Sequence, residues 1–508
     1  MSQPNLTAQI VINAQSIDLC ITDLKKMKII EQASAPVTLG DHLFISGGIT
    51  AAIVDDAIDV LVKFKMVMAD YGVTDANLVA SHAVSQAENI NFIQDQIYIQ
   101  TGMRPKLLTV NEELMYRVQA CAAFLPHFKK LIQKGIVIIQ VGASMMTLTI
   151  FQDGQITLAQ EVPLGPLRVA QTLKKLERQV VSYEDVLDEY LYSKLLEVWK
   201  MIPEQYFDRV ILMGSKLTLL ENLIPKGERA VELTHQDFDQ HFNDVMKLSD
   251  QDLDSQLPQM EADEVAPLFL MLDQIFDHLQ VKDINLTDIK LTDGLIANLN
   301  AQDKQTSNAW NYDQMILDEA QNISKRYLVD QDHQQQVLKF AMQLFDRLKK
   351  FHGLSKRDRL LLQLSAILAD TGLYLNSHHH SFHSEYIIEA SEIIGINENE
   401  QQIVAAVARY HSSSSPSLNL NNLVQFQIND KLRIAKLAAI LRLADALDDS
   451  HLAKIKKITL HLDNESRQIE ITASADKNIA LEQLTFQQKA DFFQTVYGLK
   501  PILKSSRK

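Results

Sequence analysis

Cysteine is nearly absent from this chain, because Cys20 and Cys121 are the only two among 508 residues. Two thiols cannot build the disulfide framework of a small secreted domain, so a reducing compartment is expected. The first residues have no basic stretch followed by an apolar core, so we predict no secretory signal. The chain also lacks the run of about eighteen apolar residues that a membrane-spanning helix needs. A cytoplasmic protein without a membrane partner is therefore expected.

Positive charge is also scarce. Lys and Arg number 49 against 64 Asp and Glu, which gives a net charge of −15. Such a chain lacks the basic footprint of a DNA-binding protein, and we expect no DNA partner. The same charge disfavours a polyanionic ligand unless basic residues gather locally. The length predicts two to four domains.

Short apolar strands dominate the first 300 residues. Residues 8–22 read as strand, turn and strand, followed by an amphipathic helix at 53–71. A strand at 107–110 and a helix after it are expected next. The strand–turn–strand pattern restarts at 135–165, with a hairpin turn at Asp153-Gly154. The repeat suggests two α/β halves, although one repeated opening could also be coincidence.

The chain becomes helical from about residue 312. His333 begins a helix with apolar residues at helical spacing. Further helices are predicted at 383–394, 398–411 and 433–449. An alternating hairpin at 454–475 and a helix at 485–497 then predict a small α+β piece at the end of the chain.

These helices carry most of a metal-binding hydrolase set, namely His333, Asp370, His411 and Asp445. A site of the HD type needs a His, an adjacent His-Asp pair and a distant Asp. Here Ala369 stands where the pair needs its His. Three ligands can still hold an ion that activates water, so a residual metal hydrolase is one hypothesis. The alternative is that His411 and Asp445 are buried hydrogen-bond partners.

A histidine-rich stretch lies between two of these helices. His379, His380 and His383, together with His411, could supply ligands for a second ion. The run that begins at His378 could equally be a solvated loop tract with adventitious metal affinity.

Three segments together resemble one known family. HHHSFHSEYII at 378–388, KLAAILRLADALDDS at 436–450 and FFQTVYG at 492–498 are similar to segments of the exopolyphosphatase / guanosine pentaphosphate phosphohydrolase (Ppx/GppA) family. The resemblance runs over nearly the whole chain and is clearest in the helical half.

This resemblance implies an actin-like, ribonuclease-H-like α/β fold with two lobes, at 1–125 and 126–305. An all-α HD-like domain at 312–452 and an α+β domain at 453–508 would follow. The implied reaction releases the terminal phosphate of polyphosphate or guanosine pentaphosphate with the aid of Mg²⁺. A homodimer is also implied.

The family's working residues are only partly kept. Its acidic pair matches Glu112 and Glu113, which are the candidate catalytic residues, although acids in a first helical turn also favour the helix dipole. The candidate phosphate-binding residues are Ser16, Asn89, Gly142 and Ser144. Other family acids and an arginine are replaced by Val11, Ser85, Gln140 and Thr147. These losses favour an alternative, a non-catalytic paralogue (a pseudoenzyme) that binds a nucleotide, polyphosphate or protein partner in a regulatory role.

Overall fold

The computed structural model describes residues 5–26, 28–40, 43, 47–176, 179–202, 207–217, 220, 222–248, 262–302, 312–412, 420–463 and 465–506. Its contacts divide the chain into two compact units, Met1–Asn311 and Tyr312–Lys508. Among the described residues, no helix has both the length and the apolar character to cross a membrane.

The first sheet of the first unit is a mixed sheet whose strands lie in the order β3-β2-β1-β4-β5. The strands are β1 (Leu6–Ile12), β2 (Ser16–Asp23), β3 (Lys28–Pro36), β4 (Ala76–Ala80) and β5 (Lys106–Leu107). β1 is antiparallel to β2 and parallel to β4. The short helix α3 (His82–Ser85) follows β4.

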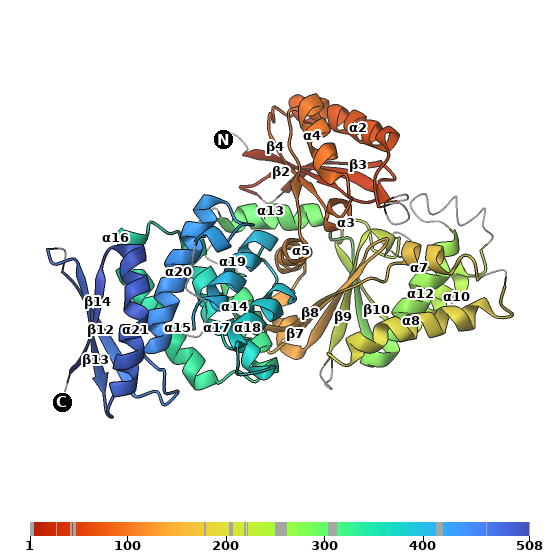
Figure 1. Ribbon diagram of the computed structural model, residues 1–508. Coiled ribbons are helices and arrows are strands. Elements are labelled where there is room, and N and C mark those ends of the chain that lie inside the picture. The colour runs from red at the N-terminus through yellow and green to blue at the C-terminus, as the bar shows by residue number, and fades with distance from the viewer. Residues whose placement is uncertain are drawn as a thin grey trace. The chain divides into compact units, whose positions relative to one another are not determined.

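Helices cover both faces of this sheet (Figure 1). The apolar sides of α2 (Ala51–Asp70) and α4 (Ile90–Thr101) form one core with strand residues such as Ile10 and Leu19. On the other face, α13 (Leu291–Gln302) packs on β1 through a cluster that includes Val11 and Leu295. α13 therefore contacts the first sheet, although about 210 residues separate it from β4 in the chain.

The second sheet has six strands in the order β10-β11-β9-β6-β7-β8. They are β6 (Ile136–Val141), β7 (Met146–Gln152), β8 (Gln155–Val162), β9 (Arg209–Met213), β10 (Ala230–Thr234) and β11 (Asp283–Thr287). β6 is antiparallel to β7 and parallel to β9, so this sheet repeats the pairing of β1 with β2 and β4. The repeat expected from the two strand–turn–strand openings is confirmed.

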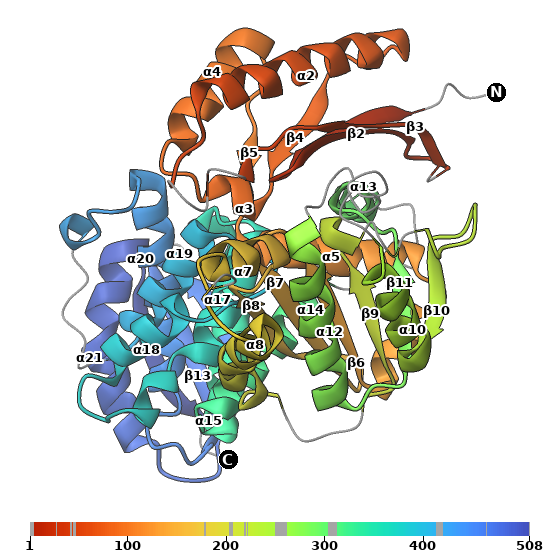
Figure 2. The same cartoon turned by 90° about the vertical axis from the view of Figure 1, so that its right-hand side faces the viewer.

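Apolar helices pack against the second sheet (Figure 2). They are α7 (Pro166–Leu173), α8 (Tyr183–Trp199), α10 (His235–Val245) and α12 (Val265–Leu279), with η2 (Ser215–Leu217) and η3 (Ala262–Glu264) beside them. Between the sheets in the sequence lie α5 (Val110–Phe124), α6 (Phe128–Leu131) and η1 (Ile132–Lys134).

Two local features differ from the sequence analysis. The strand expected at 107–110 is wrong beyond Leu107, because Thr109 caps a helix that already begins at Val110. The strand β3 was not predicted, because its side chains alternate between exposed and half-buried positions and give no apolar signal.

The second unit is a helical bundle followed by a three-stranded sheet of order β12-β13-β14 (Figure 1). α20 is central, since it packs against α15, α17, α19 and α21. The bundle comprises α14 (Tyr312–Arg326), α15 (Gln331–Arg347), α16 (Lys349–His352), α17 (Lys356–Leu368), η4 (Thr371–Tyr374), α18 (His380–Glu389), α19 (Glu398–Arg409), η5 (Leu420–Asn422) and α20 (Ile428–Ala446). The α+β piece comprises β12 (Ile455–Asp463), β13 (Gln468–Ala475), α21 (Ala480–Tyr497) and β14 (Lys500–Ser506).

Candidate functional site

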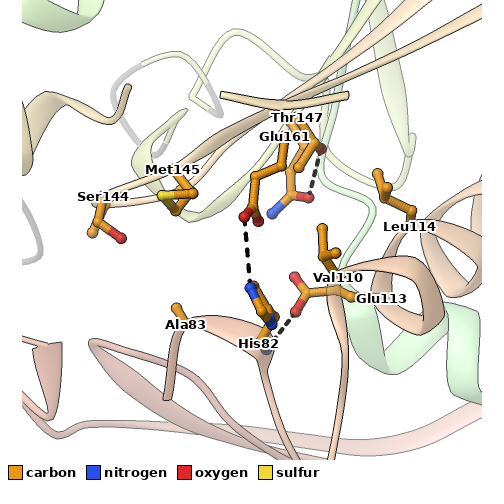
Figure 3. Close-up of a pocket in the computed structure, with 12 residues that line it drawn as sticks. His82, Ala83, Val110, Glu113, Leu114, Ser144, Met145, Thr147 and Glu161 are labelled. Atoms are coloured by element: carbon orange, nitrogen blue, oxygen red, sulfur yellow. Dashed lines mark hydrogen bonds and ion pairs between the residues drawn. The ribbon is translucent and has the colours of Figure 1, made fainter. Parts of the chain in front are cut away.

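A small pocket of about 50 Å³ lies in the first unit, where α3 and the start of α5 face the strands β6, β7 and β8 (Figure 3). Its walls thus come from segments next to the first sheet and from strands of the second sheet. The lining residues are His82, Ala83, Val110, Glu113, Leu114, Gln140, Gly142, Ala143, Ser144, Met145, Thr147 and Glu161.

The start of α5 gives its two adjacent acids different roles. Thr109 Oγ1 accepts the backbone N–H of Glu112, and the Glu112 carboxylate accepts the backbone N–H of Thr109 at 3.2 Å. Glu112 also forms an ion pair of 2.6 Å with Lys106. This capping box uses Glu112 to begin the helix. Glu113, one residue later, lines the pocket instead.

Two donors hold the buried Glu113 carboxylate in place. Oε1 accepts a hydrogen bond of 2.6 Å from Arg117, one helical turn later, and Oε2 accepts the backbone N–H of His82 at 2.9 Å. Burial opposes ionisation of this carboxyl, but Arg117 and the His82 N–H outweigh it and lower the pKa of Glu113. The pocket therefore contains a fixed carboxylate.

His82 links this carboxylate to a second one. Its Nε2 lies 3.5 Å from Glu161 Oε1 on β8. Burial opposes protonation of the imidazole, but Glu161 and Glu113 together raise the pKa of His82. The sequence analysis singled out neither Glu161 nor Arg117. The signal for Glu161 was a polar residue near the end of an apolar strand, which is also common at ordinary turns. The signal for Arg117 was its i,i+4 spacing from Glu113 on a predicted helix.

The turn between β6 and β7 forms another wall of the pocket. Gly142 donates its N–H to Met145 O at 2.9 Å, which closes a tight turn around the buried Ser144. Among the described residues, the Ser144 hydroxyl has no hydrogen-bond partner. Of the four candidate phosphate-binding residues, Gly142 and Ser144 line the pocket.

The other two candidates are engaged away from the pocket lining. Ser16 donates to Asp18 at 3.2 Å at the start of β2. Asn89 bridges both backbone groups of Ile49, accepting from its N–H and donating to its carbonyl. Val11 stands at a family acid position and packs in the apolar cluster with α13.

Mg²⁺ is the ion that the resemblance implies for this pocket. Mg²⁺ sites commonly use one or two protein carboxylates together with substrate phosphates. The pocket offers the carboxylates of Glu113 and Glu161, with the Gln140 amide beside them. This oxygen-rich donor set fits a hard divalent cation.

The four candidate metal ligands of the second unit come together in one cluster. The buried His333 ring lies 3.4 Å from Asp445 and 3.6 Å from Asp370 through Nε2, and 3.0 Å from Asp448 through Nδ1. Burial alone would lower the pKa of His333, but Asp445 and Asp448 raise it to about 10. The His333 ring is therefore a cation held among three carboxylates.

Asp370 also faces two other histidines. Its Oδ1 lies 3.4 Å from His411 Nε2 and 3.7 Å from His380 Nε2. On the far side of the cluster, Asp445 forms an ion pair with the buried Lys489 of α21. Lys489 and Asp448 were not predicted, because a single Lys in a helix or a single Asp after one carries no local signal for such a partner.

Comparison with known proteins supports the family. The model of the Ppx/GppA phosphatase family matches residues 20–302, and the model of Ppx/GppA phosphatase domain III matches residues 318–489. The chain belongs to the Ppx/GppA phosphatase family. The family membership predicted from the sequence is thus confirmed.

Solved structures also resemble this chain. An exopolyphosphatase from Cytophaga hutchinsonii matches with 15% identity and a TM-score of 0.52, covering 59% of this chain and 98% of that one. A Ppx/GppA family member from Aquifex aeolicus matches with 16% identity and a TM-score of 0.47, covering 59% of this chain and 99% of that one. The predicted two-lobed actin-like α/β fold with a helical domain after it is confirmed, while its description as HD-like stays a prediction.

Proposed function

We propose that this Ppx/GppA family member releases the terminal phosphate from a phosphoanhydride chain, polyphosphate or a guanosine polyphosphate, bound at the pocket of the first unit. The observation that carries the proposal is the state and position of Glu113. It is an ionised carboxylate, fixed by Arg117 and by the His82 N–H, and it lines a pocket beside a tight glycine-containing turn. A homodimer stays a prediction.

In this reaction, Glu113 orients the attacking water and receives its proton as the bond to phosphorus forms. Its two fixed oxygens leave the carboxylate little freedom to turn, so the water is held in one direction. The Ser144 hydroxyl, which has no hydrogen-bond partner among the described residues, donates to a phosphate oxygen. Glu161 and Glu113 raise the pKa of His82, which favours positive charge on its ring.

Charge is the main obstacle to binding a phosphate chain here. Glu113 and Glu161 contribute two negative charges to the pocket. Ser85 stands where the family has an arginine, and its hydroxyl donates to the carbonyls of His82 and Leu108. Mg²⁺, when held by Glu161, would supply the charge that screens the phosphates from these carboxylates. We therefore expect phosphate release to depend on a divalent cation.

A specific observation favours a second candidate, binding without turnover. Gln140 and Thr147 replace two family acids, and Thr147 donates to the Gln140 amide oxygen at 3.2 Å. The two side chains hydrogen-bond to each other across β6 and β7, and neither adds negative charge to the pocket. A paralogue with this pair would retain a ligand in a regulatory role and release phosphate slowly or not at all.

The test compares Glu113→Gln with Glu112→Gln as a matched control. We expect phosphate release from long-chain polyphosphate with Mg²⁺ to fall about 10²- to 10⁴-fold in Glu113→Gln. Glu112→Gln should keep its activity within a few-fold and lose only about 1 kcal/mol of stability from the capping box. Thermal melts show whether each variant is folded.

Three outcomes separate the candidates. No release by the wild type, together with measurable binding of polyphosphate, would support the second candidate. Equal activity of Glu113→Gln and wild type would overturn the role of Glu113. A loss confined to Glu112→Gln would move the reaction to the helix-capping carboxylate.

A further inference from the structure

Three ligand atoms in the second unit form a nearly equilateral triangle. His411 Nε2 and Asp370 Oδ1 are 3.4 Å apart, the two Nε2 atoms of His380 and His411 are 3.5 Å apart, and His380 Nε2 and Asp370 Oδ1 are 3.7 Å apart. These residues can hold a metal ion as a group. They come from separate segments, the start of η4, the first residue of α18 and the residues after α19.

The size of this triangle matches one face of a metal-centred tetrahedron. Zinc binds imidazole nitrogen and carboxylate oxygen at about 2.0–2.2 Å. Tetrahedral ligands at that radius are separated by about 3.3–3.6 Å from each other. The observed edges lie at or just above this range, so only small side-chain movements would bring all three atoms to bonding distance.

We propose that the second unit holds one divalent transition-metal ion of the zinc type between Asp370, His380 and His411. Two imidazoles and one carboxylate favour such an ion over Mg²⁺, which prefers oxygen ligands. Three protein ligands leave a fourth position for water or another small ligand. This site is independent of the pocket proposed for phosphate release.

The surrounding groups fix the tautomer of His411 and the orientation of Asp370. His411 Nδ1 donates a hydrogen bond to Ala408 O, so Nε2 is the ring nitrogen left to bind a metal in the triangle. The other Asp370 oxygen faces His333, which Asp448 fixes from behind at 3.0 Å. Such partners orient metal ligands and tune their basicity.

Neighbouring charges therefore separate the predicted set into two sides. His333 and Asp445 form one side, and Asp370 and His411 form the other. The Lys489 ammonium contacts Asp445 in a buried ion pair, and His333 is enclosed by carboxylates. An ion at His333 and Asp445 would have to approach the Lys489 ammonium. The side with His380, which was earlier considered only for a second ion, is the side that offers three converging ligand atoms.

The experiment measures Zn²⁺ binding by the full chain after removal of bound metal with a chelator. Competition with a chromophoric chelator gives affinity and stoichiometry, and the visible spectrum of the Co²⁺-loaded protein reports the coordination geometry. The key variant is His380→Ala, since His380 is half-buried at the start of α18. The matched control is His378→Ala, an exposed histidine of the same tract.

We expect one Zn²⁺ per chain, a tetrahedral Co²⁺ spectrum and a loss of affinity of at least about 100-fold in His380→Ala. His378→Ala should bind within about twofold of the wild type. Asp370→Asn, which keeps the side-chain shape, should weaken binding like His380→Ala. Thermal melts of the metal-free proteins check that each variant is folded.

Equal losses in His378→Ala and His380→Ala would overturn the site and show adventitious binding by the histidine tract. The absence of binding tighter than roughly 100 µM for Zn²⁺, Co²⁺ and Ni²⁺ would overturn it as well.

Discussion

At the scale of single residues, neighbours decide how a buried carboxyl ionises. Glu113 lies beside Arg117 and the His82 N–H, and its pKa is lowered despite burial. Glu319 on α14 is 4% exposed, and one of its oxygens accepts the N–H of Ile394 at 2.7 Å. Burial outweighs this hydrogen bond and raises the pKa of Glu319 to about 8. Glu319 is thus protonated at neutral pH, while Glu113 is charged.

The raised pKa of Glu319 makes the stability of the second unit depend on pH. Between about pH 4.5 and 8 the folded state holds a proton that the unfolded state has lost, so the free energy of unfolding falls as pH rises. The contribution of Glu319 to the free energy of unfolding is complete below the pKa of this residue in the unfolded chain. It is lost as the pH rises through about 8. One such proton amounts to at most about 1.4 kcal/mol per pH unit.

Glu319→Gln should remove this slope, because the amide mimics the protonated carboxyl and can still accept the Ile394 N–H. Urea unfolding of wild type and variant from pH 5 to 9 measures the slopes. The variant should be the more stable protein at pH 8. The exposed Glu389→Gln on α18 is the control and should leave the slope unchanged. Parallel curves for wild type and Glu319→Gln would contradict the assignment.

At the scale of elements, local sequence predicted most helices and hairpins but only part of each site. Periodicity correctly located the helices that carry His333 and Asp445, and family segments pointed to Glu113 and Gly142. The contacts of Glu161 with His82 and of Lys489 with Asp445 depend on which elements meet across the fold. Lys489, for example, reaches Asp445 because α21 packs on α20. No periodicity within either helix specifies that contact. Arg117, by contrast, reaches Glu113 within α5 at i,i+4 spacing, which is a local signal.

Gly372 is the position where close backbone packing bears on the proposed metal site. A Cβ at this residue would lie 2.0 Å from His380 O and 2.5 Å from Ser384 N. Both atoms belong to the backbone of α18, so they cannot move without shifting the helix start. The Gly372 N–H also donates to Ser384 Oγ at 2.9 Å. This glycine therefore fixes where His380 lies relative to Asp370.

Gly372→Ala should weaken Zn²⁺ binding at least about 10-fold and lower the free energy of unfolding by about 1–3 kcal/mol. Gly353→Ala is a useful comparison, because Gly353 has φ +61° and its added Cβ would meet nothing within 4 Å. That variant should lose about 1 kcal/mol from backbone strain and keep its Zn²⁺ affinity. Zinc titration and urea unfolding measure both effects. Unchanged affinity in folded Gly372→Ala would refute the positioning role.

At the scale of the whole molecule, the chain divides between residues 311 and 312. The two family matches fall on either side of that division, at 20–302 and 318–489. Each unit has its own buried apolar residues, such as Ile139 and Leu272 in the first and Phe340 and Leu441 in the second. The pocket lined by Glu113 and the histidine–carboxylate cluster each lie within one unit. Folding and metal binding of the second unit should therefore not require the first.

A fragment of residues 312–508 should accordingly unfold cooperatively and bind one Zn²⁺ with an affinity within about threefold of the full chain. The three ligands Asp370, His380 and His411 lie within it, as do Asp445 and its partner Lys489. The fragment must extend through β14, because that strand pairs with β13 and packs against α21. Circular dichroism melts and zinc titration test the expectation, with the His380→Ala fragment as the negative control. A fragment that melts cooperatively but binds Zn²⁺ more than about 10-fold weaker than the full chain would show that the first unit contributes to the site.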